Sequence, residues 1–160
     1  MRKILEVHMS QKLVAYYSAS GVTANRAKEL ANVTGADLFS IEPVRKYTAA
    51  DLNWMDKNSR STVEMKDKSA RPEIKETKDL SGYHTIYIGF PIWWGEAPRI
   101  INTFLDSTDF SGKTIMLFAT SGGSGISRAV NELKKTYPQL NIAGGKLLNV
   151  KVTGDILQGS

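Results

Sequence analysis

Residues Lys12–Glu42 read KLVAYYSASGVTANRAKELANVTGADLFSIE, and this segment alone predicts how the chain folds. It opens with the apolar run Lys12–Tyr17, which is typical of a buried strand. After a turn rich in Ser and Gly, apolar residues recur at helical spacing up to Gly35, at Ala24, Ala27, Leu30 and Ala31. Asp37–Glu42, closed by Pro43, is a second strand candidate. Strand, helix and strand in this order predict two parallel strands joined by a crossover helix.

The rest of the chain repeats this alternation. Further strands are predicted at Tyr83–Phe90, Thr114–Ala119 and Asn141–Leu148. Helices are expected between them, one with Pro98 in its first turn. Their apolar stripes are Ile100, Ile101, Phe104 and Leu105 in one helix, and Ile126, Ala129, Val130 and Leu133 in the other. The pattern predicts an α/β protein with a doubly wound, five-stranded parallel sheet and helices on both faces.

One segment departs from the alternation. Pro43–Asp79 holds 16 charged residues among 37 and resembles a charged insertion. Because a structureless loop of that length is unusual in a compact domain, we expect short helices at Ala49–Met55 and Ser61–Lys66. We interpret residues 11–160 as a single domain, and residues 1–10 as a leader or cloning remnant outside it.

The composition excludes several kinds of site. The chain has 160 residues and no cysteine, which removes disulfides, thiolate nucleophiles and cysteine-ligated zinc or iron–sulfur centres. With only His8 and His84, we predict no metal site, and His84 is read as an ordinary histidine. The net charge of +5 is spread thinly, so we expect no nucleic-acid surface. Without an apolar stretch of about 20 residues or a secretory signal, we expect a cytoplasmic protein with no membrane association.

The loop after the first strand is rich in hydroxyl groups. Its sequence is Ser18-Ala19-Ser20-Gly21-Val22-Thr23-Ala24-Asn25, placed between a strand and a helix N-terminus. Such a turn can bind a phosphate through hydroxyls and backbone N–H groups, and it can equally be a Ser-rich helix cap. GxxxxGK[ST] and GxGxxG are both absent, which excludes a nucleoside-triphosphate loop and argues against a Rossmann dinucleotide site.

Two more loops of unusual composition end at the same edge of the sheet. Phe90–Pro98 carries Trp93 and Trp94, and we expect at least one of them to be exposed as a flat surface for an aromatic ligand. Thr120–Gly125 carries three glycines, which allow the backbone to approach a flat ligand closely. The glycine that a nucleophile elbow needs after Ser124 is replaced by Ile126, so no catalytic serine is predicted.

Together these loops resemble those of the flavodoxins. The resemblance runs from Lys12 to about Asp155, and Tyr47–Glu64 is similar to a bacterial subgroup of the family. It implies a sheet of strand order 2-1-3-4-5 and one non-covalently bound FMN. Because no insertion interrupts the fifth strand, the chain resembles the short-chain members.

The resemblance also implies which residues bind the cofactor. The phosphate would be held by Ser18, Ser20, Gly21, Val22, Thr23, Ala24 and Asn25. The isoalloxazine would be flanked by Pro91, Ile92, Trp93, Trp94 and Gly95 on one side, and by Thr120, Ser121, Gly122, Gly123 and Gly125 on the other. A peptide group by Gly95 or Gly122 would hydrogen-bond the flavin N5, and no catalytic side chain is implied.

Three features depart from the family pattern. The third loop lacks the Tyr that covers the flavin in many flavodoxins, so Trp94 or Trp54 would cover that face, or it would be open to substrate. The last helix is short or absent, reduced to Asp155–Ser160, so its contact surface on the sheet should be exposed or covered by a partner. Typical flavodoxins are acidic, whereas this chain is basic.

Three functions remain open at this stage. The first is a low-potential FMN electron-transfer protein that serves redox partner proteins as a monomer or weak dimer. The second is an FMN-dependent NAD(P)H oxidoreductase of the quinone reductase kind. The third is a non-enzymatic binding domain that has kept the fold without the flavin.

Overall fold

A computed structural model describes residues 11–152 of the chain and shows one parallel sheet of five strands. The strand order is β2-β1-β3-β4-β5, which confirms the 2-1-3-4-5 sheet implied by the resemblance. The strands are β1 (Lys12–Tyr16), β2 (Asp37–Ser40), β3 (Thr85–Pro91), β4 (Thr114–Thr120) and β5 (Asn141–Leu147). All neighbouring pairs are parallel.

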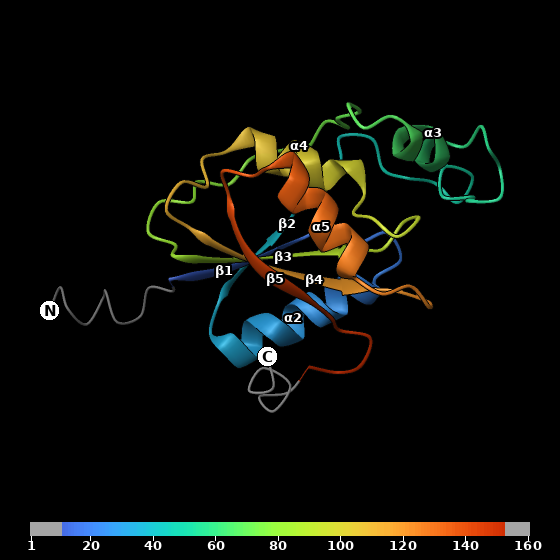
Figure 1. Cartoon of the computed structure of the whole chain (residues 1–160). Coiled ribbons are helices and arrows are strands. Elements are labelled where there is room, and N and C mark those ends of the chain that lie inside the picture. The colour runs from blue at the N-terminus through green and yellow to red at the C-terminus, as the bar shows by residue number, and fades with distance from the viewer. Residues whose placement is uncertain (1–10, 153–160) are drawn as a thin grey trace, which may run out of the picture.

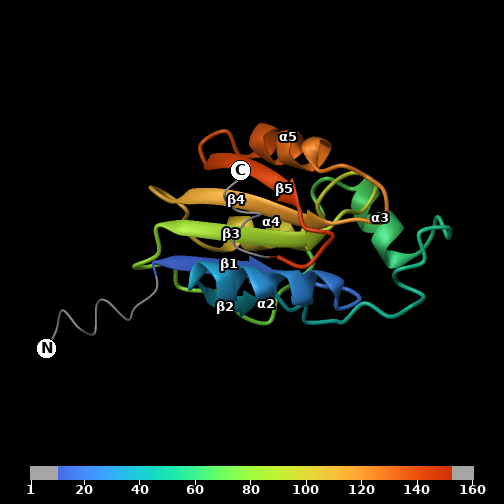
Figure 2. The ribbon, with the colours of Figure 1, turned by 90° about the horizontal axis from the view of Figure 1, so that it is seen from below.

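Helices cover both faces of this sheet, as the sequence predicts (Figure 1). They are α2 (Val22–Thr34), α3 (Arg60–Lys66), α4 (Arg99–Ser107) and α5 (Ser127–Thr136). α2 packs on one face, and α4 and α5 pack on the other. The remaining helix, α3, lies beyond the carboxyl-terminal edge of the strands, next to the loops that follow them (Figure 2).

The apolar stripes account for this packing. α4 buries Ile100, Ile101 and Phe104 against the inward residues of the sheet, in the larger of two hydrophobic clusters. α2 buries Ala27 and Leu30 on the opposite face, in a smaller cluster. Because both faces are covered, the central strands are apolar at nearly every position, which is why the sequence predicts them well.

The segment between β2 and β3 is a long loop closed at its base. The N–H of Val44 donates to the carbonyl of Glu73 at 2.9 Å, and the N–H of Lys75 donates to the carbonyl of Glu42 at 2.8 Å. The predicted helix at Ser61–Lys66 is confirmed as α3, which begins one residue earlier.

The predicted helix at Ala49–Met55 is wrong, because turns occupy these positions. One helical-type backbone bond forms, from the N–H of Leu52 to the carbonyl of Thr48 at 3.1 Å, but short polar side chains bind nearby backbone N–H groups and the helix does not continue. Asp51 accepts from the N–H of Thr48 at 2.9 Å, and Asn53 accepts from the N–H of Met55 at 3.1 Å. Asn and Asp stabilise turns through such local bonds.

The fifth strand is irregular and lies at an edge of the sheet. Its pairing with β4 steps from Ile142 directly to Gly144, so that Ala143 is left as a bulge. Beside α2, a hollow of about 410 Å³ lies over β3–β5, where we expected the surface for a last helix to be exposed or covered by a partner. The predictions for residues 1–10 and for Asp155–Ser160 fall outside the described residues. Within residues 11–152, no helix has the length and apolar character to cross a bilayer.

Candidate functional site

A cavity of about 640 Å³ opens at the carboxyl-terminal edge of the sheet, where ligands of such folds bind. All three loops singled out in the sequence contribute to its wall, and so does the long segment between β2 and β3. The lining residues are Ala19, Ser20, Leu52, Trp54, Ser61, Pro91, Ile92, Trp93, Trp94, Ser121, Gly122, Gly123 and Ser124. The volume is in the ordinary range for a small-molecule site.

The first loop leads directly into α2. Gly21 takes a left-handed conformation with φ of 97° and precedes the first helical residue. The hydroxyl of Ser18 accepts hydrogen bonds from the N–H groups of Gly21 and Ala24, both at 3.1 Å. No acidic side chain stands in the first turn of α2, so the positive helix end is left for an anion.

The predicted phosphate residues do not all face the cavity. Ser20 lines it, whereas Thr23 is buried beneath the loop. The Thr23 hydroxyl oxygen lies 2.7 Å from that of Thr120, and this hydrogen bond joins the first loop to the end of β4. The side chains of Thr23 and Thr120 therefore hold two loops together, and only their backbone groups would be left for a ligand.

The second loop makes a tight turn around Trp94 and Gly95. The N–H of Trp93 donates to the carbonyl of Glu96 at 2.8 Å, and the N–H of Glu96 donates back at 2.9 Å. Trp94 and Gly95 have φ of 51° and 79°, the signs that a type I′ turn requires. Among residues 11–152, Trp94 is the one non-glycine residue with positive φ. Such strain on a bulky residue points to function.

The two adjacent tryptophans face different surroundings. The side chain of Trp94 is 43% exposed and lines the cavity. Trp93 is half-buried and packs edge-on against two tyrosines, with ring centroids 5.9 Å from Tyr17 and 5.4 Å from Tyr47. The expectation that at least one of the pair is exposed is thus confirmed.

Hydrogen bonds to the side chain of Ser121 fix the conformation of the third loop. The Ser121 hydroxyl accepts hydrogen bonds from the N–H groups of Gly123 at 3.1 Å and Ser124 at 2.7 Å. The N–H of Ser121 donates to the side-chain oxygen of Asn149 at 2.8 Å. A Cβ added at Gly122, Gly123 or Gly125 would meet no atom within 4 Å. Gly122 and Gly123 thus leave room on the cavity side that a flat ligand could fill, while Gly125 lies outside the lining.

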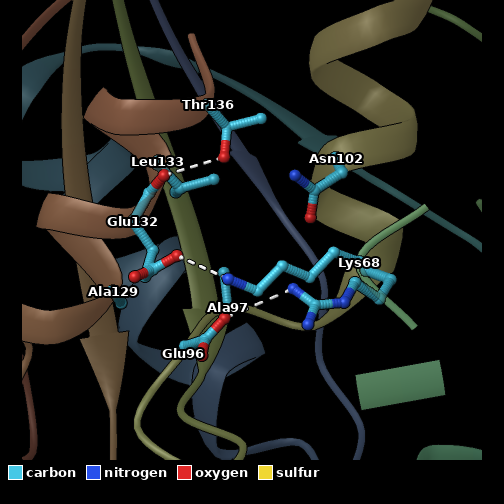
Figure 3. A pocket seen from close by; sticks show the side chains of 9 residues that line it. Lys68, Glu96, Ala97, Asn102, Ala129, Glu132, Leu133 and Thr136 are labelled. Atoms are coloured by element: carbon cyan, nitrogen blue, oxygen red, sulfur yellow. Dashed lines mark hydrogen bonds and ion pairs between the residues drawn. The ribbon is translucent and has the colours of Figure 1, made fainter. Parts of the chain in front are cut away.

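A buried ion pair joins the second loop to the start of α4, and its arginine also binds the backbone of α3. Glu96 follows the Trp94 turn, and its carboxylate lies 3.4 Å from the guanidinium of Arg99. Arg99 also donates to the backbone carbonyls of Met65 at 2.7 Å and Glu64 at 3.3 Å, in the last turn of α3. Figure 3 shows this region, where a cavity of about 20 Å³ has the size of one water molecule. Arg99 therefore fixes the position of α3 relative to the loop.

Two charged side chains of α3, Arg60 and Glu64, surround the ring and hydroxyl of Tyr47. The Tyr47 hydroxyl donates to Glu64, whose other oxygen pairs with Arg60 at 2.9 Å. The Arg60 guanidinium also lies 3.7 Å from the centre of the Tyr47 ring, a cation–π contact. Burial, with the hydrogen bond to Glu64, raises the pKa of Tyr47, and burial likewise raises the pKa of Tyr17.

Ser61 of α3 also lines the cavity, although the sequence predicts no binding residue in this helix. It is 2% exposed, and its hydroxyl has no hydrogen-bond partner within residues 11–152. The neighbouring Ser59 caps α3 by accepting from the N–H of Thr62 at 3.4 Å. In the sequence, a run of Ser and Thr before a helix indicates a cap, so it carries no signal that one member faces a ligand. Leu52, which also lines the cavity, carries no such signal in the sequence either, whereas Trp54 is predicted there as one possible cover of the flavin face.

The described residues that line the cavity are all uncharged. No Asp, Glu, His, Lys, Arg or Tyr is among the described residues that line it. It offers aromatic faces, hydroxyls and peptide groups. Such a wall can bind a flat, partly apolar ligand, and it supplies no side chain that gains or loses a proton near neutral pH.

Comparison with known proteins places this geometry among flavin proteins. A family model described as flavodoxin matches residues 11–159. A candidate flavoprotein from Bacteroides eggerthii is 49% identical with a TM-score of 0.91, covering 94% of this chain and 95% of that one. Another from Bacteroides uniformis is 51% identical with a TM-score of 0.89, covering 94% and 96%.

A more distant structure contains a ligand. A flavoprotein from Lactobacillus acidophilus, solved in complex with FMN, is 25% identical with a TM-score of 0.70, covering 87% of this chain and 93% of that one. A search of curated proteins gave no match.

Proposed function

The chain belongs to the flavodoxin family, and from this premise we propose that it binds one FMN and serves as a low-potential electron-transfer protein. The related flavoprotein from Lactobacillus acidophilus was solved with FMN, which supports this cofactor. The cavity of about 640 Å³ lies where the three loops converge, and it is the site we assign to the flavin.

The residues present fit FMN on two observations of the structure. Ser61 lines the cavity, and its buried hydroxyl has no partner among the described residues. A buried hydroxyl without a partner is unfavourable, and a ligand in the cavity could supply one. The open space above Gly122 and Gly123 suits the close approach of a flat ring. Neither feature has an evident structural role.

Each loop has a distinct part in binding. The phosphate would lie at the N-terminus of α2, held by Ser20 and the backbone N–H groups of Val22 and Thr23. The N–H groups of Gly21 and Ala24 already donate to Ser18, and that of Asn25 donates to the carbonyl of Gly21. The ring would lie between the Trp94 turn and the third loop, with the Trp94 side chain as an aromatic wall. The peptide groups at Gly95 and Gly122 are the candidates for contact with the flavin N5.

The main support for an electron-transfer function is that the described residues lining the cavity include no ionisable side chain. FMN, when bound, supplies redox chemistry that the side chains of this protein lack. The protein would bind the ring, orient it and exclude water. An enzyme acting on an organic substrate commonly adds a side-chain acid or base near neutral pH, and none lines this cavity.

The net charge indicates the kind of partner. With a charge of +5, the chain would be attracted to acidic redox proteins and repelled by basic ones. Electron transfer to an acidic partner should therefore slow markedly as the salt concentration rises.

An anaerobic redox titration of the FMN-loaded protein tests the proposal. We expect tight FMN binding and two separate one-electron steps, the second at low potential. A protein that ignores added FMN would exclude both flavin functions and favour a binding domain without a flavin.

A second candidate function is an FMN-dependent NAD(P)H oxidoreductase, favoured by one observation. Trp54 lines the cavity from the long segment yet is 69% exposed, so it offers a second planar surface beside that of Trp94. A nicotinamide or quinone would stack on an uncovered flavin face. NADPH oxidation with a quinone, compared with free FMN at equal concentration, tests it, and equal rates would exclude it.

A further inference from the structure

We propose that Ser61 of α3 is a binding residue for the flavin ring, hydrogen-bonding one of its polar atoms. This inference rests on the proposed function, since it needs FMN in the cavity. It adds the segment between β2 and β3 to the three loops as a fourth wall of the cofactor site.

The main evidence is the contrast between Ser61 and its neighbours. Three buried hydroxyl residues stand together at the start of α3: Ser59, Ser61 and Thr62. The hydroxyls of Ser59 and Thr62 bond each other at 2.9 Å, and Ser59 also caps the helix. Only the hydroxyl of Ser61 lacks a partner among the described residues, and only Ser61 of the three lines the cavity.

A buried hydroxyl without a partner is unfavourable, so it calls for an explanation. Of the other lining residues of this segment, Leu52 has no polar side-chain group, and the indole N–H of Trp54 makes no hydrogen bond to Ser61. A flavin ring presents carbonyl oxygens, ring nitrogens and an N–H along its edges. Because a serine hydroxyl donates and accepts, it can pair with any of these groups.

The backbone around Ser61 is fixed before any ligand binds. Its N–H donates to the carbonyl of Asp51 at 3.0 Å, which anchors the start of α3. The end of α3 is anchored by Arg99, which donates to the carbonyls of Glu64 and Met65 and is paired with Glu96. The hydroxyl is therefore held at the cavity wall without loss of backbone freedom on binding, which favours affinity.

The ring is a better partner than the phosphate. The phosphate has its own site at the N-terminus of α2, formed by a different loop. The side chains that line the cavity from the Ser61 segment, Leu52 and Trp54, are apolar and aromatic, which suits the ring.

The test compares FMN with riboflavin, which has the same ring and no phosphate. We expect Ser61→Ala to weaken both ligands by the same factor, about 3- to 10-fold, as for one hydrogen bond. Dissociation constants come from quenching of flavin fluorescence with the apo full-length chain. The melting temperature of the apo protein should stay the same or rise, because the lost hydroxyl has no partner.

Thr62→Ala is the matched control. Thr62 is also buried and lies in the same turn, but it does not line the cavity, so both dissociation constants should stay within 2-fold of those of the unmodified protein. Its apo melting temperature should fall, because the bond to Ser59 is lost. Ser61→Cys, of nearly the same size with a weak hydrogen-bonding group, should repeat the loss of affinity if the alanine variant folds poorly.

The outcomes separate this inference from the proposed function. If the unmodified protein binds neither flavin, the proposed function itself fails. If it binds FMN and both Ser61 variants bind as tightly, the role of Ser61 is excluded while the function stands. If the Ser61 variants bind FMN more weakly but bind riboflavin as before, Ser61 contacts the phosphate, and the proposed contact with the ring is wrong.

Discussion

The hydroxyls of Thr23 and Thr120 lie 2.7 Å apart in the interior, although the residues are 97 positions apart in the chain. Their hydrogen bond ties the helix of the first loop to the strand that leads into the third loop. We expect Thr120→Val to lower the free energy of unfolding by about 1–3 kcal/mol, because it leaves the Thr23 hydroxyl buried and unpaired. Urea unfolding of the apo protein measures this.

The double variant Thr23→Val with Thr120→Val is the control. Replacing both hydroxyls by methyl groups of similar shape should recover most of the lost stability. If the two single losses simply add, the hydroxyls do not depend on each other and the coupling between the loops is refuted.

The strained turn at Trp94 predicts opposite effects on stability and binding. Trp94→Asn creates an Asn-Gly pair, the dipeptide preferred in type I′ turns, so the apo protein should gain about 0.5–1 kcal/mol. FMN affinity should fall by about 10-fold, because an aromatic wall of the cavity is lost. Thermal unfolding and fluorescence titration measure the two effects. A loss of apo stability above about 1 kcal/mol would make Trp94 a packing residue instead.

Gly122 in the third loop and Gly89 in β3 should respond differently to an added methyl group. A Cβ at Gly122 would meet nothing within 4 Å, so Gly122→Ala should leave apo stability within about 0.5 kcal/mol. We expect it to weaken FMN binding, since the methyl would occupy the space meant for the ring. Calorimetric titration with FMN checks this, and unchanged affinity would mean that the ring lies elsewhere.

Gly89 is the contrasting position. A Cβ there would lie 2.1 Å from the ring of Phe118, which pairs with it on β4. Gly89→Ala should cost about 1–3 kcal/mol through overpacking. A neutral result in urea unfolding would show that Phe118 has another conformation available.

The buried tyrosines predict how stability depends on pH. The pKa values of Tyr17 and Tyr47 are raised above their ordinary value of 10.0, mainly by burial. Above about pH 10 the unfolded chain releases protons that the folded protein retains, so stability should be level below pH 10 and decline above it. The urea midpoint between pH 7 and 11.5 measures this, and Tyr47→Phe should make the decline shallower. An unchanged slope would mean that Tyr47 ionises freely in the folded state.

The sheet could be predicted from the sequence because its signals are local. Thr85–Ile88 and Thr114–Leu117 are short apolar runs bounded by turn residues, and buried parallel strands need little else. The sequence also predicts that the three loops lie together, because parallel strands all end at the same edge of the sheet.

What escaped prediction depends on contacts between distant segments. Arg99 follows a proline at a helix start and reads as a surface charge, but its partners are carbonyls of Glu64 and Met65, about 35 positions earlier. Ser61 reads as part of a helix cap, and only the placement of α3 against the loops turns it toward the cavity. The turns at Ala49–Met55 arose because side-chain bonds to the backbone outweighed helix propensity.

The bulge at Ala143 affects how readily the protein can aggregate through the edge of its sheet. β5 is one edge of the sheet and β2, with four residues, is the other. An open strand edge is a template on which another chain can add itself, which begins aggregation. The bulge breaks the regular spacing of N–H and C=O groups along β5, and the shortness of β2 leaves little to pair with. For the electron-transfer function proposed above, these edges would keep the protein from joining its sheet to that of a redox partner.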